Sequence, residues 1–222
     1  DINKPYVING VEQVVGASIG IALIPDDGDD ADELLRLADL AMYDAKGRGR
    51  NGFCFFSPEL NQVAQANART EMELREAISE GQFELEFQPV VEITDRKLVG
   101  MEALIRWNHP TRGRLLPKDF LSVASDSGMM DLIGNWVIEA ACRQIVRLRD
   151  RGLFVPRISV NISPRQFLTQ NVVHEILSRV ERFGVDPAHL CIEITEEVLL
   201  ERNREIIDAL KALRKAGINI SI

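Results

Sequence analysis

The second half of the chain alternates short apolar segments that have a two-residue period with longer segments that have a helical period. The first kind is typical of strands and occurs at 83–91, 98–107, 158–162, 190–195 and 219–222. The second kind is typical of amphipathic helices and occurs at about 117–126, 131–150, 171–183 and 203–216. Repeated strand-then-helix units predict an α/β fold, with a parallel sheet and helices outside it.

The first 57 residues show a shorter version of this alternation. Residues 17–24 predict a buried strand, an amphipathic helix runs through Ala45, and residues 52–56 predict a return strand. One helix and two strands bury too little surface to fold alone, so we expect residues 1–57 to be the end of a larger domain. Ser57 and Pro58 then start a polar linker helix that extends to about residue 80, and residues 81–222 form the second domain.

Polar side chains recur on one face of the predicted strands in the second domain. Glu102 and Arg106 lie opposite the apolar face of the strand at 98–107, and Asn161 and Glu193 do the same in later strands. A parallel strand with helices on both sides is apolar on both faces, and a buried carboxylate without a partner costs several kcal/mol. This face therefore meets water or holds cations. In a closed βα barrel, the apolar face of each strand packs against the outer helices, and the polar side chains meet water or cations at the mouth formed by the carboxyl ends of the strands.

Two glutamates and an asparagine form a set of oxygen ligands, which suits Mg²⁺ or Mn²⁺ better than zinc. Arg106 lies four residues after Glu102 and so on the same side of the strand, where it could bind an anion such as phosphate. Solvated residues at strand ends would produce the same pattern. On periodicity alone, both interpretations stay open.

Composition narrows the class of protein. Hydrophobic residues make up 45% of the 222 residues and charged residues 27%, as in globular domains, and no apolar run is long enough to span a bilayer. The net charge of -8 disfavours a DNA-binding surface. Three widely separated cysteines indicate free thiols in a reducing compartment. We therefore expect a cytoplasmic location, with membrane contact only through segments outside this chain.

The segment at 102–107, Glu-Ala-Leu-Ile-Arg-Trp, is accompanied in fixed order by five further motifs. These are Phe-Gln-Pro-Val-Val at 87–91, His-Pro at 109–110, Pro117 with Phe120, Val-Asn-Ile-Ser at 160–163 and Glu-Ile-Thr-Glu at 193–196. With them, residues 70–222 resemble the EAL family, bacterial phosphodiesterases that linearise cyclic di-GMP. The resemblance implies a modified (βα) TIM-type barrel, of which this chain holds the N-terminal part.

The same resemblance implies roles for individual residues. Glu102, Asn161 and Glu193 correspond to ligands of two divalent ions, Mg²⁺ or Mn²⁺, and some acids of that site lie beyond this chain. Glu196 corresponds to an acid that supports the neighbouring loop of the catalytic site. Two such ions activate a water and stabilise an in-line displacement at phosphorus.

The resemblance also implies a substrate pocket. Arg106 corresponds to a phosphate contact, and Gln88 and Leu104 correspond to residues that bind the dinucleotide. The implied reaction is hydrolysis of cyclic di-GMP to linear pGpG.

Residues 1–57 resemble the C-terminal part of a GGDEF domain, the partner family that makes cyclic di-GMP. The resemblance rests on Ala-Ser-Ile-Gly-Ile-Ala at 17–22, on residues 38–46 and on Gly-Arg-Asn at 49–51. It implies that Lys46 and Arg50 contact the triphosphate of GTP. Cations are also favoured at a helix C-terminus by the helix dipole, so both interpretations of these two residues stay open. We infer no cyclase activity.

These observations lead to one expected function and two alternatives. We expect a cyclic di-GMP phosphodiesterase, active as a homodimer in the complete protein. Residues 1–222 alone should be inactive, because five strands do not close a barrel that needs about eight. The alternatives are a sensor that binds cyclic di-GMP without cutting it and a dimerisation module with no nucleotide.

Overall fold

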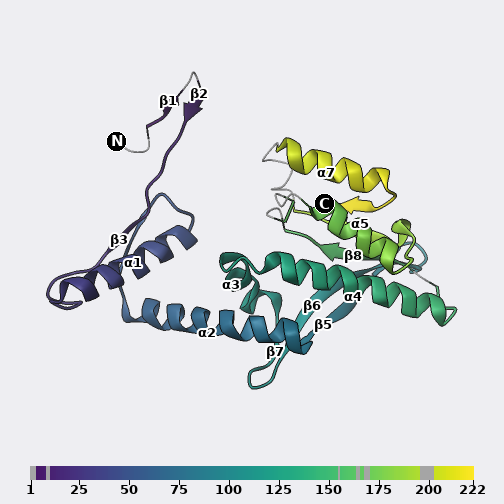
Figure 1. The fold of residues 1–222 in the computed structure, drawn as a ribbon, viewed down its shortest axis with the longest axis horizontal. Helices are drawn as coiled ribbons and strands as arrows, with labels where there is room; N and C mark the ends of the chain where they lie inside the picture. The colour runs from purple at the N-terminus through teal and green to yellow at the C-terminus, as the bar shows by residue number, and fades with distance from the viewer. Residues whose placement is uncertain (1–3, 9–10, 155, 164–165, 168–170, 196–202) are drawn as a thin grey trace. The chain divides into compact units, whose positions relative to one another are not determined.

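The computed structural model describes residues 4–8, 11–154, 156–163, 166–167, 171–195 and 203–222 (Figure 1). The chain divides into two compact units, Asp1–Thr70 and Glu71–Ile222. Each unit is described by itself below.

The first unit contains the expected strand, helix and return strand. Strands β3 (Ile19–Ile21) and β4 (Phe53–Phe55) pair in parallel, and α1 (Ala31–Gly47) connects them. A hairpin of β1 (Tyr6–Ile8) and β2 (Val11–Gln13) precedes them. The sequence pattern did not indicate this hairpin, because three-residue strands are too short to show a period.

Local chemistry explains where α1 begins and how closely it packs. The Asp30 side chain accepts a hydrogen bond from the backbone N–H of Glu33 at 2.9 Å, which caps the helix. A Cβ on Gly20 would lie 1.8 Å from the carbonyl oxygen of Ala38. Only glycine therefore allows β3 to approach α1 this closely.

The second unit is built on one mixed sheet of six strands. Its strands are β5 (Phe83–Val91), β6 (Leu98–His109), β7 (Gly113–Leu115), β8 (Arg157–Asn161), β9 (Leu190–Glu193) and β10 (Asn219–Ser221). The order is β10-β9-β8-β6-β5, and β7 pairs with β6. Strands β6, β8, β9 and β10 are parallel, as expected.

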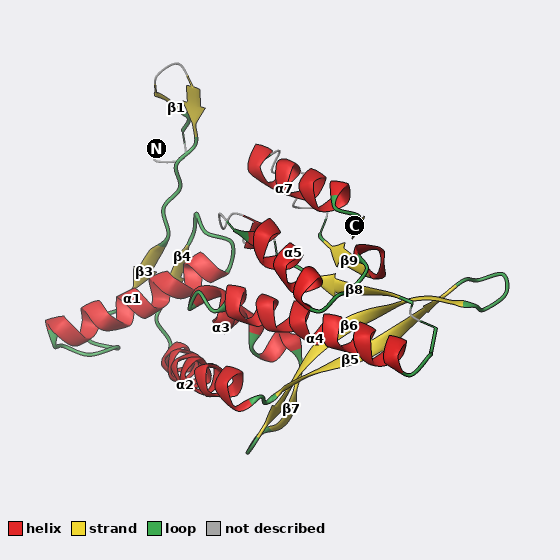
Figure 2. Cartoon of the chain, turned by 45° about the vertical axis from the view of Figure 1, so that its right-hand side comes forward, coloured by secondary structure: helices red, strands yellow, loops and turns green. Residues whose placement is uncertain are grey.

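Strand β5 departs from the predicted parallel sheet, because it runs antiparallel to β6. The connection between β5 and β6 is too short for a parallel crossover, which needs a dozen or more residues. Figure 2 shows these two strands as a long twisted hairpin.

The helices of this unit match the sequence prediction closely. They are α2 (Pro58–Glu80), η1 (Pro117–Asp119), α3 (Leu121–Asp126), α4 (Met130–Asp150), α5 (Val172–Arg182), η3 (Pro187–His189) and α7 (Arg204–Lys215). The helix expected at 117–126 is divided into η1 and α3. Helix α2 begins in the first unit and ends in the second.

The core lies between one face of the sheet and the helices. Ile158, Val160 and Ile192 are fully buried on that face and belong to one apolar cluster with residues of α4, α5 and α7. Most of the apolar side chains at 131–148 belong to the same cluster, whereas Leu132 is exposed. Among the described residues, no helix is both long and apolar enough to cross a bilayer.

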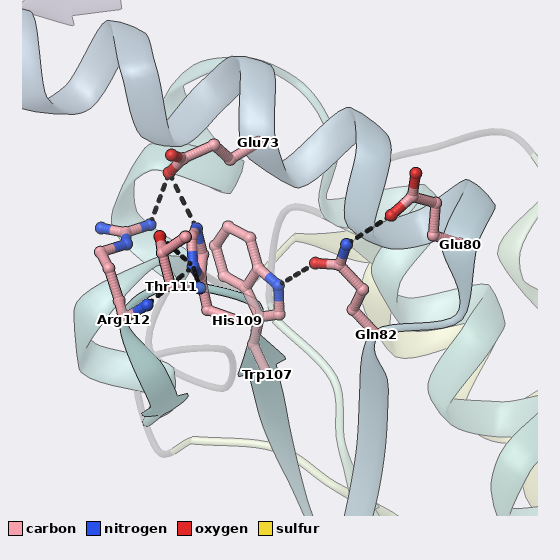
Figure 3. Close-up of polar contacts among 7 residues, drawn as sticks. All are labelled: Glu73, Glu80, Gln82, Trp107, His109, Thr111 and Arg112. Atoms are coloured by element: carbon pink, nitrogen blue, oxygen red, sulfur yellow. Dashed lines mark hydrogen bonds and ion pairs between the residues drawn. The ribbon is translucent and has the colours of Figure 1, made fainter.

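Polar contacts fix the end of α2 against β6 (Figure 3). The buried His109 ring lies 3.1 Å from the Glu73 carboxylate, through Nε2 and Oε2, in a close contact rather than an aligned hydrogen bond. The same oxygen accepts a hydrogen bond from Arg112 at 2.8 Å, and Trp107 Nε1 donates to Gln82 at 2.9 Å. These contacts fix the carboxyl end of β6, the strand that carries Glu102 and Arg106.

Candidate functional site

The strand register places the predicted site residues on one face of the sheet. Gln88 of β5 lies opposite Glu102 of β6, and Glu102 lies opposite Ser159 of β8. Two residues further along β8, Asn161 lies opposite Glu193 of β9. Because directly paired residues point to the same side, all of these side chains share one face, which we call the polar face.

Two of the three predicted metal ligands are in direct contact. Asn161 Nδ2 donates a hydrogen bond of 2.8 Å to Glu102 Oε1. Glu193 lies on the adjacent strand, about 4.8 Å away across the ladder, and is only half-buried. Its carboxylate has no protein partner among the described residues. The structure thus gathers Glu102, Asn161 and Glu193 on the polar face of three neighbouring strands, with Asn161 and Glu193 at the carboxyl ends of β8 and β9 and Glu102 within β6.

The donor atoms of this set fit a hard divalent cation. All three side chains offer oxygen, which Mg²⁺ and Mn²⁺ prefer, and Mg²⁺ usually keeps several waters beside a few protein ligands. Within the described ranges, no group of three or more His, Cys, Asp or Glu side chains could hold a metal ion. The described set is therefore two carboxylates and one amide, enough for part of a coordination shell.

Arg106 lies on the polar face and is anchored at two points. Its Nε donates to Glu86 Oε2 at 2.5 Å, and its Nη1 donates to the carbonyl of Ile105 at 2.9 Å. Only 13% of its side chain is exposed. Its Nη2 has no partner in the described part of the chain and remains available to an anion.

The remaining predicted substrate residues differ in their surroundings. Leu104 and Asn161 line the same largely apolar cavity of about 250 Å³, between β6, α3 and α4. Gln88 is exposed on the polar face beside Glu102. Glu196 lies outside the described residues.

In the first unit, Lys46 and Arg50 line one cavity of about 360 Å³ together with Ser18 and Asn51. Arg50 and Asn51 both have positive φ angles, of 60° and 53°. Two consecutive left-handed residues turn the chain sharply after α1. The structure therefore brings the two predicted cations to one concave site.

Sequence reasoning missed a group of charges next to Arg106. Arg114 of β7 contacts Glu86 Oε1 at 2.7 Å and also pairs with Glu84. A signal was present, because Glu84 and Glu86 alternate with apolar residues along β5 and so share the face of Gln88. Arg114 carries no such signal, because β7 is three residues long.

Comparisons with known proteins agree with this geometry. Residues 71–222 match the EAL domain family, and residues 1–52 match the diguanylate cyclase GGDEF domain. The chain is 39% identical over 221 residues to the bifunctional diguanylate cyclase/cyclic di-GMP phosphodiesterase MucR of Pseudomonas aeruginosa, covering all of this chain and 32% of that protein. It is 35% identical over 222 residues to the cyclic di-GMP phosphodiesterase PdeR of Escherichia coli, covering all of this chain and 33% of that protein. The chain thus spans about a third of the length of these curated relatives.

Solved structures give the same assignment. The PaMucR phosphodiesterase in complex with c-di-GMP aligns with a TM-score of 0.66 and 34% identity, over 69% of this chain and 62% of that one. The EAL enzyme Bd1971, in its cAMP- and cyclic-di-GMP-bound form, aligns with a TM-score of 0.66 and 26% identity, over 88% of this chain and 51% of that one. The expected modified TIM-type barrel is confirmed as the fold of the second unit. The chain belongs to the EAL domain family, with a GGDEF domain segment at its N-terminus.

Proposed function

We propose that the complete protein is a phosphodiesterase that hydrolyses cyclic di-GMP to linear pGpG. The observation that carries the proposal is the placement of Glu102, Asn161 and Glu193 on one face of three adjacent strands, beside the available Nη2 of Arg106. The relatives MucR and PdeR, whose names state this activity, support the same reaction.

The charge of the polar face supports a requirement for cations. Its described charged side chains include four carboxylates, of Glu84, Glu86, Glu102 and Glu193, against three guanidinium groups, of Arg106, Arg114 and Arg157. A dinucleotide with two phosphodiester charges would be repelled by this excess of negative charge. Bound divalent ions reverse the sign, so affinity for the substrate should rise with the concentration of Mg²⁺ or Mn²⁺.

Each residue then has a defined task. Glu102, Asn161 and Glu193 would hold the divalent ions, which, when bound, supply an activated water and neutralise charge on the oxygens around phosphorus. Arg106 would direct Nη2 to a phosphate oxygen of the substrate.

The dinucleotide itself would lie between two further positions. Leu104, which pairs with Glu86 and so shares the polar face, would contact it from β6, and Gln88 would bind it from β5. We retain Glu196 in its predicted role of supporting the neighbouring loop.

A second ligand is proposed for the first unit. Lys46 and Arg50 line one cavity, and two cations at one concave site suit the triphosphate of GTP. This supports a nucleotide-binding role for the GGDEF segment.

Hydrolysis of cyclic di-GMP by the full-length protein, with Mg²⁺ or Mn²⁺, tests the main proposal. Glu102→Gln should reduce kcat/KM by at least about a hundredfold, because it removes a charged oxygen ligand and pairs two amides. Glu71→Gln is the matched control: within the described residues Glu71 pairs with the exposed Arg75 alone, so the substitution should leave turnover unchanged. Equal turnover by Glu102→Gln and wild type would refute the metal assignment.

The same assay separates the hydrolase from a sensor. A wild-type protein that binds cyclic di-GMP but does not cut it would establish the sensor alternative. Absence of binding would favour the dimerisation module.

A further inference from the structure

The polar face carries a chain of four alternating charges that includes Arg106. Arg106 Nε donates to one oxygen of Glu86 at 2.5 Å, and Arg114 contacts the other oxygen of Glu86 at 2.7 Å. Arg114 also pairs with Glu84. The four residues come from β5, β6 and β7 and are brought together only by strand pairing.

Arg106 is held before any ligand binds. Glu86 occupies its Nε, and the carbonyl of Ile105 occupies one position of its Nη1. These two contacts leave Nη2 as the guanidinium nitrogen without a partner among the residues described. An arginine that is fixed in this way loses less rotamer freedom when it binds an anion than one that rotates freely.

The negative charge of Glu86 has an opposing effect, because it lies near the position of a bound phosphate. Arg114 reduces this effect, since it contacts the Glu86 oxygen that does not face Arg106. Together with Glu84, which also pairs with Arg114, the four residues are neutral, so the charge of Glu86 beside Arg106 is compensated within the group. Positioning of Arg106 should outweigh repulsion by Glu86.

We propose that Glu86 is a positioning residue for substrate binding. Its carboxylate fixes the Arg106 guanidinium so that Nη2 faces the phosphate, while Arg114 pairs with the other oxygen of Glu86 and offsets its negative charge. This inference rests on the proposed hydrolysis of cyclic di-GMP and adds a residue of β5 to the determinants of that site.

Three variants of the full-length protein test the proposal. Glu86→Ala should weaken binding about tenfold, equivalent to about 1.4 kcal/mol, seen as a raised KM with kcat changed less than threefold. Glu86→Gln keeps an acceptor for Arg106 Nε and should recover much of the loss. Glu84→Ala is the matched control, because Glu84 contacts Arg114 and not Arg106, and should change KM less than twofold.

The measurements are kinetics with cyclic di-GMP and Mg²⁺, and calorimetric titration with the product pGpG at the same Mg²⁺ concentration. A merely structural role for Glu86 would lower the folded fraction without changing KM or the product Kd. Unchanged or tighter binding by Glu86→Ala would overturn the inference, as would an equal loss in Glu84→Ala.

A failure of the proposed function is distinguishable from a failure of this inference. If the wild type does not hydrolyse cyclic di-GMP, the titration uses cyclic di-GMP itself, and the order wild type, Glu86→Gln, Glu86→Ala in affinity still decides the role of Glu86. If the wild type binds neither nucleotide, both proposals are overturned.

Discussion

Cys142 lies in α4 with no exposed surface, and burial raises the pKa of its thiol from 9.0 to about 11, with a further contribution from the Glu139 carboxylate. Because the pKa is higher in the folded state, the neutral thiol favours folding below pH 9, and this contribution is lost between pH 9 and 11. At pH 10 the loss is about 1.4 kcal/mol. Cys142→Ala should therefore lose about 1.4 kcal/mol less stability than the wild type between pH 8 and 10.

Urea unfolding monitored by tryptophan fluorescence measures this difference, because both tryptophans, Trp107 and Trp136, lie in the second unit. The comparison of two pH values cancels any cost of the substitution that does not depend on pH. Parallel pH profiles for wild type and variant would contradict the predicted role of burial.

Single residues also show what the sequence could and could not indicate. Alternation along the strands was enough to place Glu102, Asn161 and Glu193 on one face, because the side-chain period of a strand is fixed. The contact of Arg106 with Glu86 was not predictable, because it depends on the register between β5 and β6. A shift of one residue in that register would move Glu86 to the other face.

At the scale of elements, one carboxylate of α2 makes polar contacts both with β6 and with the loop that follows it. Glu73 Oε2 contacts the buried His109 ring and accepts a hydrogen bond from Arg112. Glu73→Ala removes a partly buried acceptor next to the buried His109 and should destabilise the second unit by about 1–3 kcal/mol. Tryptophan-monitored urea unfolding is again the measurement, and Glu73→Gln should cost less, since it keeps an acceptor.

Glu71→Ala is the control for this prediction, because it lies on the same helix and removes only an exposed ion pair with Arg75. It should cost less than about 1 kcal/mol. Equal effects of Glu71→Ala and Glu73→Ala would show that the contact with His109 contributes nothing beyond a surface pair.

A second element-scale prediction concerns the segment that follows β8. A Cβ on Gly134 of α4 would lie 1.9 Å from Gln166 Nε2, and Gln166 is buried with hydrogen bonds to the backbone of Met130 and Ser163. Gly134→Ala should cost about 1–2 kcal/mol in urea unfolding, because lost hydrogen bonds outweigh the gain of about 1 kcal/mol in helix propensity.

A double-mutant cycle checks the cause. Gln166→Ala removes the clashing group, so Gly134→Ala should cost little in that background, and the two effects should be non-additive by more than about 0.5 kcal/mol. Additive effects would mean that the cost of Gly134→Ala arises elsewhere in α4.

The same scale explains which elements escaped prediction. Helices such as α4 extend over many turns, so their period was clear, whereas β7 spans only three residues and shows none. The antiparallel pairing of β5 was missed because the parallel arrangement predicted from strand-then-helix repeats was also applied to β5 and β6, which are joined by a short loop without a helix. Pairing direction follows from loop length, and the loop at 92–97 held that information.

At the scale of the whole molecule, the two units carry two distinct sets of the side chains for which we propose ligands. The polar face lies entirely within Glu71–Ile222, whereas the cavity with Lys46 and Arg50 lies within Asp1–Thr70. Motif order along the chain indicated two segments, because each family's motifs occupy separate parts of the sequence. Motif order did not indicate which further residues would complete the proposed metal site. At that position the described polar face offers two carboxylates and one amide, enough for part of a coordination shell.

The double substitution Lys46→Ala with Arg50→Ala tests the separation of the two sites. It removes both cations from the cavity in the first unit and should weaken GTP binding by the full-length protein at least about tenfold, because these groups would pair with the triphosphate. Hydrolysis of cyclic di-GMP without GTP should change less than twofold, because its proposed ligands lie in the other unit. Calorimetry with GTP and a turnover assay on the same preparation measure the two effects. Unchanged GTP affinity would mean that Lys46 and Arg50 do not bind the triphosphate. They would then be solvated cations at the C-terminal end of α1, where the helix dipole favours positive charge.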